Sequence, residues 1–113
     1  MKKRPRQVVW SNSAAADLAE LARYIGRHNP ENLDSVLKRL REEAEKLATF
    51  AERGRIVPEL REQQITNYRE RIVHPWRLVY RIAGEQILIA AVIDGRRDFS
   101  EHLLKRALRA DRT

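Results

Sequence analysis

The chain has 113 residues, of which 42% are hydrophobic and 35% are charged, a balance typical of one compact folded domain and not of a disordered chain. It contains no cysteine, which excludes disulfide bonds, thiolate catalysis and zinc–thiolate sites. Lysine and arginine number 23 against 16 aspartates and glutamates, and the resulting net charge of +7 favours an anionic partner such as nucleic acid or an acidic protein.

No segment has the length and composition of a membrane anchor. The basic N-terminus, MKKRPRQVVW, begins like a signal peptide, but no apolar h-region follows it. The longest apolar run, ILIAAVI at residues 87–93, is far too short to cross a bilayer. We therefore expect a cytoplasmic protein with a single domain, residues 1–113, and no membrane partner.

The first half of the chain predicts a strand followed by two helices. Residues 6–10, RQVVW, are a short strand candidate. Ser11 or Ser13 can cap the helix that follows, and Gly26 marks its expected end. A second amphipathic helix follows a short turn, with its end expected near Gly54. Two such helices form an αα-hairpin, which needs an apolar surface to cover.

The second half changes to the alternating pattern of strands. The segment RIVPEL, residues 55–60, is expected to be an edge segment or loop because of its proline. Residues 68–73 and 76–82 alternate around a break at His74-Pro75, and residues 87–93 are apolar on both faces, as in a central strand. A short helix is expected around residues 103–108. The order predicts an α+β fold, with an N-terminal strand and helical hairpin packed on a small antiparallel β-sheet and a short C-terminal helix.

A group of arginines marks one face of the predicted sheet. In the strand at residues 76–82, the aromatic and leucine side chains point to the core, so Arg77 and Arg81 point to the opposite, open face. Arg69 and Arg71 share that face if the register of the neighbouring strand allows it. An antiparallel sheet commonly has one wetted face, which arginine covers well. The group is therefore either a solvated surface or a site for an anion.

Few other residues are candidates for catalysis. None of the three histidines has a partner at metal-ligand spacing, so no metal site is expected. His102 is the one histidine worth testing as an acid or base. Glu59, Arg77 and His102 would form an acid–base set with a cation if folding brings them together. The sequence has no phosphate-binding glycine loop, nucleophile elbow or zinc pattern, so no cofactor is expected.

Four segments together resemble the RelE/ParE superfamily, the toxins of bacterial type II toxin–antitoxin modules. They are a helix with the pattern SxxAxxDLxELxRYI at residues 11–25, then GRIVPEL, YRERIVHPWRLVYRI and VIDGRRDF. The resemblance extends from about Val8 to Leu108. It implies an antiparallel sheet with a helical hairpin at the start and a helix at the end, in agreement with the predicted order of elements.

The resemblance also implies one of two activities. RelE-like toxins cleave mRNA in the ribosomal A site without a metal, whereas ParE-like toxins inhibit growth by binding and poisoning DNA gyrase. The implied partners are a cognate antitoxin from a neighbouring gene and either gyrase or the ribosome with its mRNA. Arg77 matches an arginine that supports the phosphate in the nucleases, and Arg69, Arg71 and Arg97 match further basic positions.

At the catalytic positions of the family's nucleases, this chain matches the pattern in part and departs from it in part. Glu59 resembles the general-base glutamate of one nuclease branch. Nucleases of the family often have a tyrosine near the C-terminus, where this chain has Leu103, with His102 beside it. We therefore expect a ParE-like toxin that poisons gyrase. The alternative is a RelE-like endoribonuclease in which Glu59, Arg77 and His102 act in catalysis and Arg69, Arg71, Arg77 and Arg97 hold the phosphate.

Overall fold

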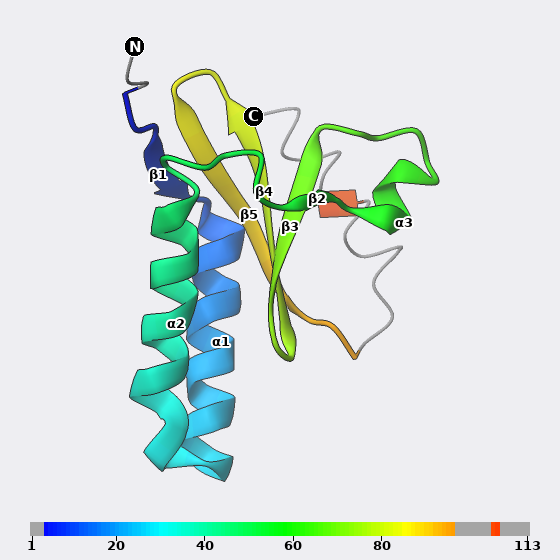
Figure 1. Ribbon diagram of the computed structural model, residues 1–113. Helices are drawn as coiled ribbons and strands as arrows, with labels where there is room; N and C mark the ends of the chain where they lie inside the picture. Colours follow the sequence, from blue (N-terminus) through cyan, green and yellow to red (C-terminus); the bar gives the residue numbers. More distant parts are fainter. Residues whose placement is uncertain (1–3, 97–104, 107–113) are drawn as a thin grey trace.

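The computed structural model describes residues 4–96 and 105–106 (Figure 1). The predicted α+β fold is confirmed. The elements are β1 (Gln7–Trp10), α1 (Asn12–His28), a 3₁₀ turn (Pro30–Asn32), α2 (Leu33–Lys46), β2 (Arg55–Ile56), α3 (Pro58–Arg61), β3 (Tyr68–Val73), β4 (Trp76–Ala83) and β5 (Gln86–Asp94). Of the expected C-terminal helix, only residues 105–106 are described, and they are helical.

The strands form one five-stranded sheet in the order β1-β5-β4-β3-β2. The neighbours β2, β3, β4 and β5 pair antiparallel, as predicted. The pair between β1 and β5 is parallel, which the sequence pattern did not indicate. The apolar strand β5 therefore lies inside the sheet, between β1 and β4, and β1 and β2 form the two edges.

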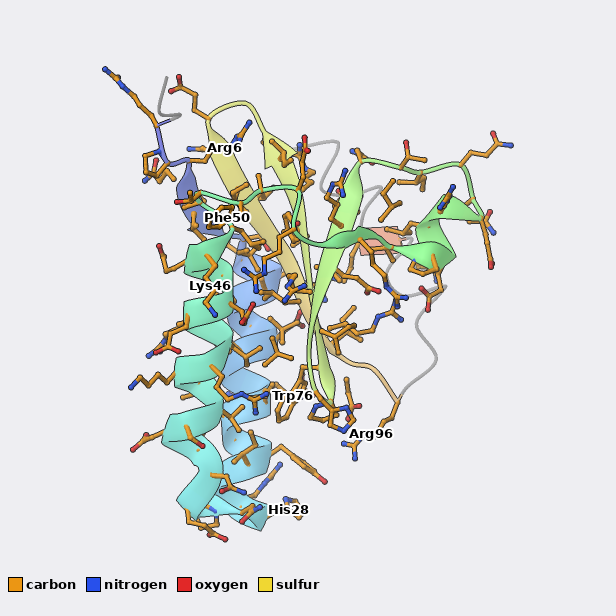
Figure 2. All side chains as sticks on the ribbon, in the orientation of Figure 1. Arg6, His28, Lys46, Phe50, Trp76 and Arg96 are labelled. Atoms are coloured by element: carbon orange, nitrogen blue, oxygen red, sulfur yellow. The ribbon has the colours of Figure 1, made fainter. Side chains whose placement is uncertain are left out.

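The two long helices lie side by side along one face of the sheet (Figure 1). Of the two predicted caps, Ser11 is the one used, because its hydroxyl accepts a hydrogen bond from the Ala14 N–H at 3.0 Å. The expected end at Gly26 is wrong, since α1 continues to His28 (Figure 2). Pro30 follows two residues later and cannot continue the helix. Among the described residues, no helix has the length and apolar character needed to span a membrane.

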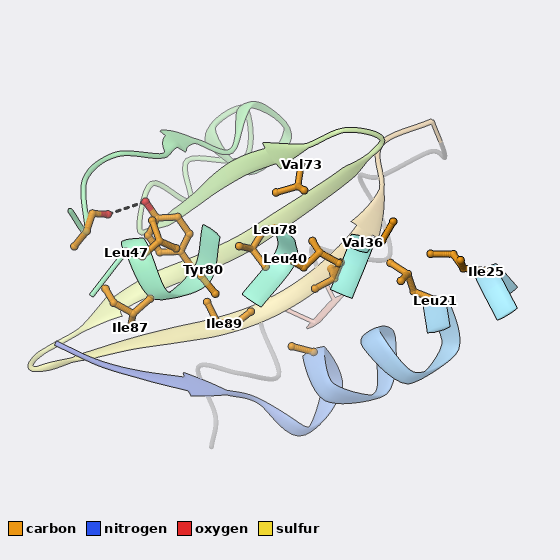
Figure 3. Packing of buried hydrophobic residues seen from close by; sticks show 14 residues of the cluster. Leu21, Ile25, Val36, Leu40, Leu47, Val73, Leu78, Tyr80, Ile87 and Ile89 are labelled. Atoms are coloured by element: carbon orange, nitrogen blue, oxygen red, sulfur yellow. Dashed lines mark hydrogen bonds between the residues drawn. The ribbon is translucent and has the colours of Figure 1, made fainter. Parts of the chain in front are cut away.

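The main core lies between the helical hairpin and the sheet (Figure 3). Leu40 of α2 and Leu47, directly after its end, are fully buried, and they belong to the same apolar cluster as Leu78, Tyr80 and Ile89 of the sheet. Burying side chains of this size is the main favourable term in folding. The prediction that the hairpin needs an apolar surface to cover is confirmed by this cluster.

A second, smaller core covers part of the opposite face of the sheet. Val57 and Leu60, on and beside α3, pack against Tyr68, Val79 and Ala91. This cluster explains why β5 is apolar on both faces. The irregular segment after β2 therefore forms a short helix that covers the sheet, and the face that carries Arg77 is not the open, wetted face that the sequence led us to expect.

The loop between α2 and β2 is fixed to the sheet by Tyr80. Its buried hydroxyl accepts a hydrogen bond from the Gly54 N–H at 2.9 Å and donates one to the Ala51 carbonyl at 2.7 Å (Figure 3). A Cβ atom at Gly54 would lie 2.6 Å from the Glu70 carbonyl oxygen, so only glycine fits there. The expected end of the second helix near Gly54 is wrong, since α2 ends at Lys46 and a loop held by Tyr80 follows it.

We expect Tyr80→Phe to lower the free energy of unfolding by about 1–3 kcal/mol, because it leaves a buried N–H and a buried carbonyl without partners. Urea denaturation measures the effect. Tyr24→Phe is the matched control, since Tyr24 is 52% exposed and should change stability little. Equal stabilities for the two variants would contradict the role of the Tyr80 hydroxyl.

Candidate functional site

Arg77 of β4 lies between two carboxylates on the face of the sheet that α3 covers. Its Nε donates to Glu70 Oε1 at 2.6 Å and its Nη2 to Glu70 Oε2 at 3.0 Å. Its Nη1 and Nη2 donate to the two carboxylate oxygens of Glu59, both at 2.7 Å. Arg77 is 8% exposed and Glu70 is 1% exposed. The guanidinium is thus surrounded by carboxylate oxygens inside the protein.

The pairing of three strands brings these side chains together. In the β3–β4 hairpin, Ile72 pairs with Arg77 and Glu70 with Val79, so Glu70 and Arg77 share one face of the sheet. The edge strand β2 pairs Arg55 with Glu70, and the Arg55 Nε donates to Glu70 Oε2 at 2.8 Å. Glu59 reaches the site from α3. We call Arg55, Glu59, Glu70 and Arg77 the carboxylate–arginine cluster.

Hydrogen bonding favours the charged forms of Arg77 and Glu59. Burial by itself lowers the pKa of Arg77, but the hydrogen bonds that it donates to Glu59 and Glu70 raise the pKa above its ordinary value on balance. The hydrogen bond from Arg77 in turn lowers the pKa of Glu59, against a smaller opposing effect of burial. Two carboxylates and two guanidinium groups make the cluster formally neutral, although the whole chain is strongly basic.

Arg69 and Arg71 lie on the other face of the sheet. Arg69 pairs with Tyr80 and Arg71 with Leu78, so both face the helical hairpin. The Nη1 of Arg69 donates to the Gly54 carbonyl at 2.8 Å. The expectation that these two arginines share a face with Arg77 is therefore wrong.

The short β3–β4 turn explains this arrangement. Only His74 and Pro75 separate β3 from β4. This spacing sets Arg77 opposite Ile72 and not opposite an arginine.

The structure brings together some of the predicted site residues. Glu59 and Arg77 are in direct contact, as the acid–base hypothesis required. Arg97 and His102 lie outside the described residues. Glu70, the most buried carboxylate of the cluster, was missed. Its position, two residues after Tyr68 in the alternating strand, was the signal that it shares a buried face.

The described residues offer no metal site. Within residues 4–96 and 105–106, no three side chains of histidine, aspartate or glutamate gather closely enough to hold an ion. The carboxylates of Glu59 and Glu70 are bonded to Arg77 instead.

Residues 8–99 match the family described as the ParE toxin of the type II toxin–antitoxin system parDE. The chain belongs to this family. It is 30% identical to the Toxin RelE2 of Caulobacter vibrioides over 76% of its length and 91% of that protein. It is 28% identical to the Toxin ParE3 of the same organism over 88% of its length and 97% of that protein.

Two solved structures share the fold. A chain from the chromosomal ParDE system of P. aeruginosa superposes with a TM-score of 0.67 at 20% identity, over 81% of this chain and 98% of that one. A chain from the RelBE2 toxin–antitoxin complex of Mycobacterium tuberculosis gives 0.57 at 23% identity, over 82% and 94%. With the family match, the chain is a type II toxin of the RelE/ParE superfamily.

We expect Arg77→Ala to lower the free energy of unfolding by about 3–5 kcal/mol, because it leaves the Glu70 carboxylate buried without its main partner. The double variant Arg77→Ala, Glu70→Ala should be more stable than Arg77→Ala alone, since it removes the uncompensated charge. Urea denaturation of both variants, with the exposed Arg41→Ala as control, measures this. A double variant less stable than the single one would contradict the explanation.

The lowered pKa of Glu59 makes its contribution to stability depend on pH. A carboxyl group with a lower pKa in the folded chain stabilises the fold fully above its unfolded pKa of about 4.3. That stability is lost as the pH falls through the folded pKa. The difference in free energy of unfolding between the wild type and Glu59→Gln should therefore narrow in acid. Urea denaturation from about pH 6 to about pH 3 tests this, with the exposed Glu62→Gln as the control for removing a carboxylate.

Proposed function

We propose that this toxin inhibits growth by binding and poisoning DNA gyrase in the ParE manner, and that a cognate antitoxin neutralises it. The family model that matches is that of the ParE toxin. The single observation that carries the choice of a binding mode is the engagement of Arg77 by Glu59 and Glu70. A toxin that acts by contact alone needs no arginine reserved for a phosphate.

The charges of the carboxylate–arginine cluster support this choice. Cleavage of RNA develops negative charge on the phosphate, which a nuclease stabilises with preorganised cations. In this chain both oxygens of the Glu59 carboxylate already accept hydrogen bonds from Arg77. An incoming phosphate would have to displace that carboxylate and leave Glu59 partly buried without its bond.

The positions of the other arginines support it as well. Catalysis by positioning requires the groups that hold a phosphate to converge on one point. Arg69 and Arg71 face the helical hairpin, whereas Arg77 faces α3. These three side chains therefore approach the sheet from its two opposite faces.

Glu59 is poorly suited to act as a general base. An efficient base has a pKa near the working pH. The hydrogen bond from Arg77 lowers the pKa of Glu59, so the carboxylate has little affinity for a proton at neutral pH. These properties favour a structural role for Glu59, which holds Arg77 in place.

The alternative function is ribosome-dependent cleavage of mRNA. It is favoured by the 30% identity to a protein named Toxin RelE2. In that case Glu59, Arg77 and His102 would be the catalytic set, and Arg69, Arg71 and Arg97 would hold the RNA. The hydrogen bonds between Glu59 and Arg77 would then have to break when the ribosome binds, so that both side chains can contact the RNA.

The antitoxin part of the proposal rests on charge and on the solved relatives. The chain has a net charge of +7, which suits an acidic segment that becomes ordered on binding. Both similar structures come from toxin–antitoxin systems. A small acidic protein encoded beside this toxin is the expected partner.

Two measurements on the same expressed toxin separate the functions. We expect purified gyrase to lose supercoiling activity, or to accumulate cleaved DNA, when the toxin is added, while mRNA in growing cells stays intact. Mapping of mRNA 5′ ends on translating ribosomes is the second measurement. Cuts in phase with codons, without an effect on gyrase, would overturn the proposal. The controls are the addition of the antitoxin to the gyrase assay and its co-expression in the cells used for mapping.

A further inference from the structure

Arg81 of β4 has no partner among the described residues. Its Nε is buried and has no hydrogen-bond acceptor within reach. Its guanidinium makes no hydrogen bond or ion pair in the part of the chain that the structure describes, and the side chain as a whole is only partly exposed. A cation held in this way has lost part of its hydration without gaining a compensating contact.

The other arginines of the strands each contact a carboxylate or a carbonyl group. They are Arg55, Arg69, Arg71 and Arg77. Arg106, from the C-terminal part that the structure describes, is bonded to Asp17 and to the Ala90 carbonyl. The unpaired state of Arg81 is therefore a property of its position and not of the sheet in general. Natural proteins break such a local rule mainly at functional sites.

Arg81 lies in a row of side chains that crosses four strands. It is directly opposite Tyr68 of β3 and Leu88 of β5, and Leu88 is opposite Val9 of β1. Residues that are opposite one another project from the same face of a sheet. This is the face that α3 covers in part, but α3 and β1 lie at opposite sides of the sheet (Figure 1). The row therefore extends from the edge of the smaller core toward β1.

The apolar side chains at the β1 end of this row belong to neither core. Tyr68 is a member of the smaller core, whereas Val9 and Leu88 are members of neither cluster. Both of these side chains are partly exposed. We call Val9, Arg81 and Leu88 the Arg81 patch. It combines apolar surface with one unpaired cation, and packing of the two cores accounts for neither.

The charge of Arg81 is not balanced by the residues that surround the patch. The next residues on this face along β1 and β5 are Gln7 and Gln86, which pair with each other and are exposed and uncharged. Glu85 lies in the turn between β4 and β5, and its described contacts do not include Arg81. The described side chains of the row and of its glutamine rim thus carry a single charge, which suits an anionic group on a partner.

We propose that the Arg81 patch is the centre of the surface through which this toxin contacts gyrase, and that Arg81 binds a carboxylate of that protein. The proposal rests on the proposed poisoning of gyrase and names the part of the toxin that makes the contact. A guanidinium donates two parallel hydrogen bonds to a carboxylate, and the contact strengthens where water is excluded. Val9 and Leu88 exclude water on one side of it. Arginine within apolar surroundings is a frequent centre of binding energy in protein interfaces.

The patch fits a protein better than a nucleic acid. Single-stranded nucleic acids bind through several phosphates and through bases stacked on aromatic rings, and a DNA duplex binds through many phosphate contacts. The patch offers one free cation, and the aromatic member of the row, Tyr68, is 1% exposed. An acidic side chain with apolar neighbours would use both the cation and the apolar surface.

The variant Arg81→Met separates a binding role from a structural one. Methionine has a long apolar side chain that needs no partner, so the variant should be at least as stable as the wild type in urea denaturation, because a buried donor without an acceptor is removed. It should nevertheless require about 10-fold more toxin for half-inhibition of supercoiling by purified gyrase. The matched control is Arg41→Met, at an exposed arginine of α2, which should act within about 2-fold of the wild type.

A second pair of variants tests the charge alone. Leu88→Glu places a carboxylate directly opposite Arg81, where it engages the arginine within the toxin itself. We expect Leu88→Glu to weaken inhibition of gyrase about 10-fold or more, and the uncharged Leu88→Gln to weaken it clearly less. Equal losses in the two variants would contradict the role of Arg81 as the group that binds an anion.

The outcomes distinguish this inference from the proposed function. Inhibition by Arg81→Met at the wild-type concentration would overturn the inference and leave the poisoning of gyrase standing. A marked loss of stability in Arg81→Met would also overturn it, because Arg81 would then be a structural residue. Failure of the wild-type toxin to bind or inhibit gyrase would contradict the proposed function itself.

Two further titrations exclude the other occupants of the patch. Calorimetry with the protein encoded by the neighbouring open reading frame, and with a DNA duplex in the absence of gyrase, should give the same affinity for the wild type and for Arg81→Met. Weaker binding of either one by Arg81→Met, with unchanged inhibition of gyrase, would assign the patch to the antitoxin or to DNA and overturn the inference.

Discussion

The register of the β3–β4 hairpin is the constraint on which the rest of the structure depends. Only His74 and Pro75 separate the two strands, and Arg77 lies opposite Ile72. This register places Glu70 beside Arg77 on the face that α3 covers. It also turns Arg69 and Arg71 toward the helical hairpin. A shift of the register by one residue would move every side chain of β3 to the other face. Arg69 and Arg71 would then lie on the face beneath α3, where Glu70 now pairs with Arg77.

The buried ion pair between Glu70 and Arg77 has a cost that its surroundings must offset. Both groups lose their hydration, and such pairs add stability only when their remaining hydrogen bonds are made. Arg55 and Glu59 supply those bonds from β2 and α3. The same contacts fix these two short elements to the sheet. Because the cluster is neutral, the excess positive charge of the toxin lies elsewhere in the chain.

The sequence predicted the larger elements because their patterns are local. Ser11 as one of two possible caps, the helical hairpin and the central position of β5 all follow from spacing and apolar content. The burial of Arg77 was missed because it depends on α3, a single turn whose packing leaves no periodic signal. The face of Arg77, opposite Leu78 and Tyr80, was predicted correctly. The β3 residues that share this face were missed, although the two-residue turn implies that even-numbered residues of β3 share a face with odd-numbered residues of β4. The sequence predicted a contact between Glu59 and Arg77 only if folding brings them together. Residues this far apart in the chain give no local signal that they lie close in the fold.

The parallel pairing of β1 with β5 has a consequence for synthesis. Val9 lies opposite Leu88, so the first strand of the chain pairs with the last strand of the sheet. The helical hairpin leaves the ribosome long before the strands that it covers, and its apolar face has no partner until β4 and β5 emerge. Completion of the sheet must therefore wait until nearly the whole chain has been translated. Native contacts of such large sequence separation are the ones that slow folding.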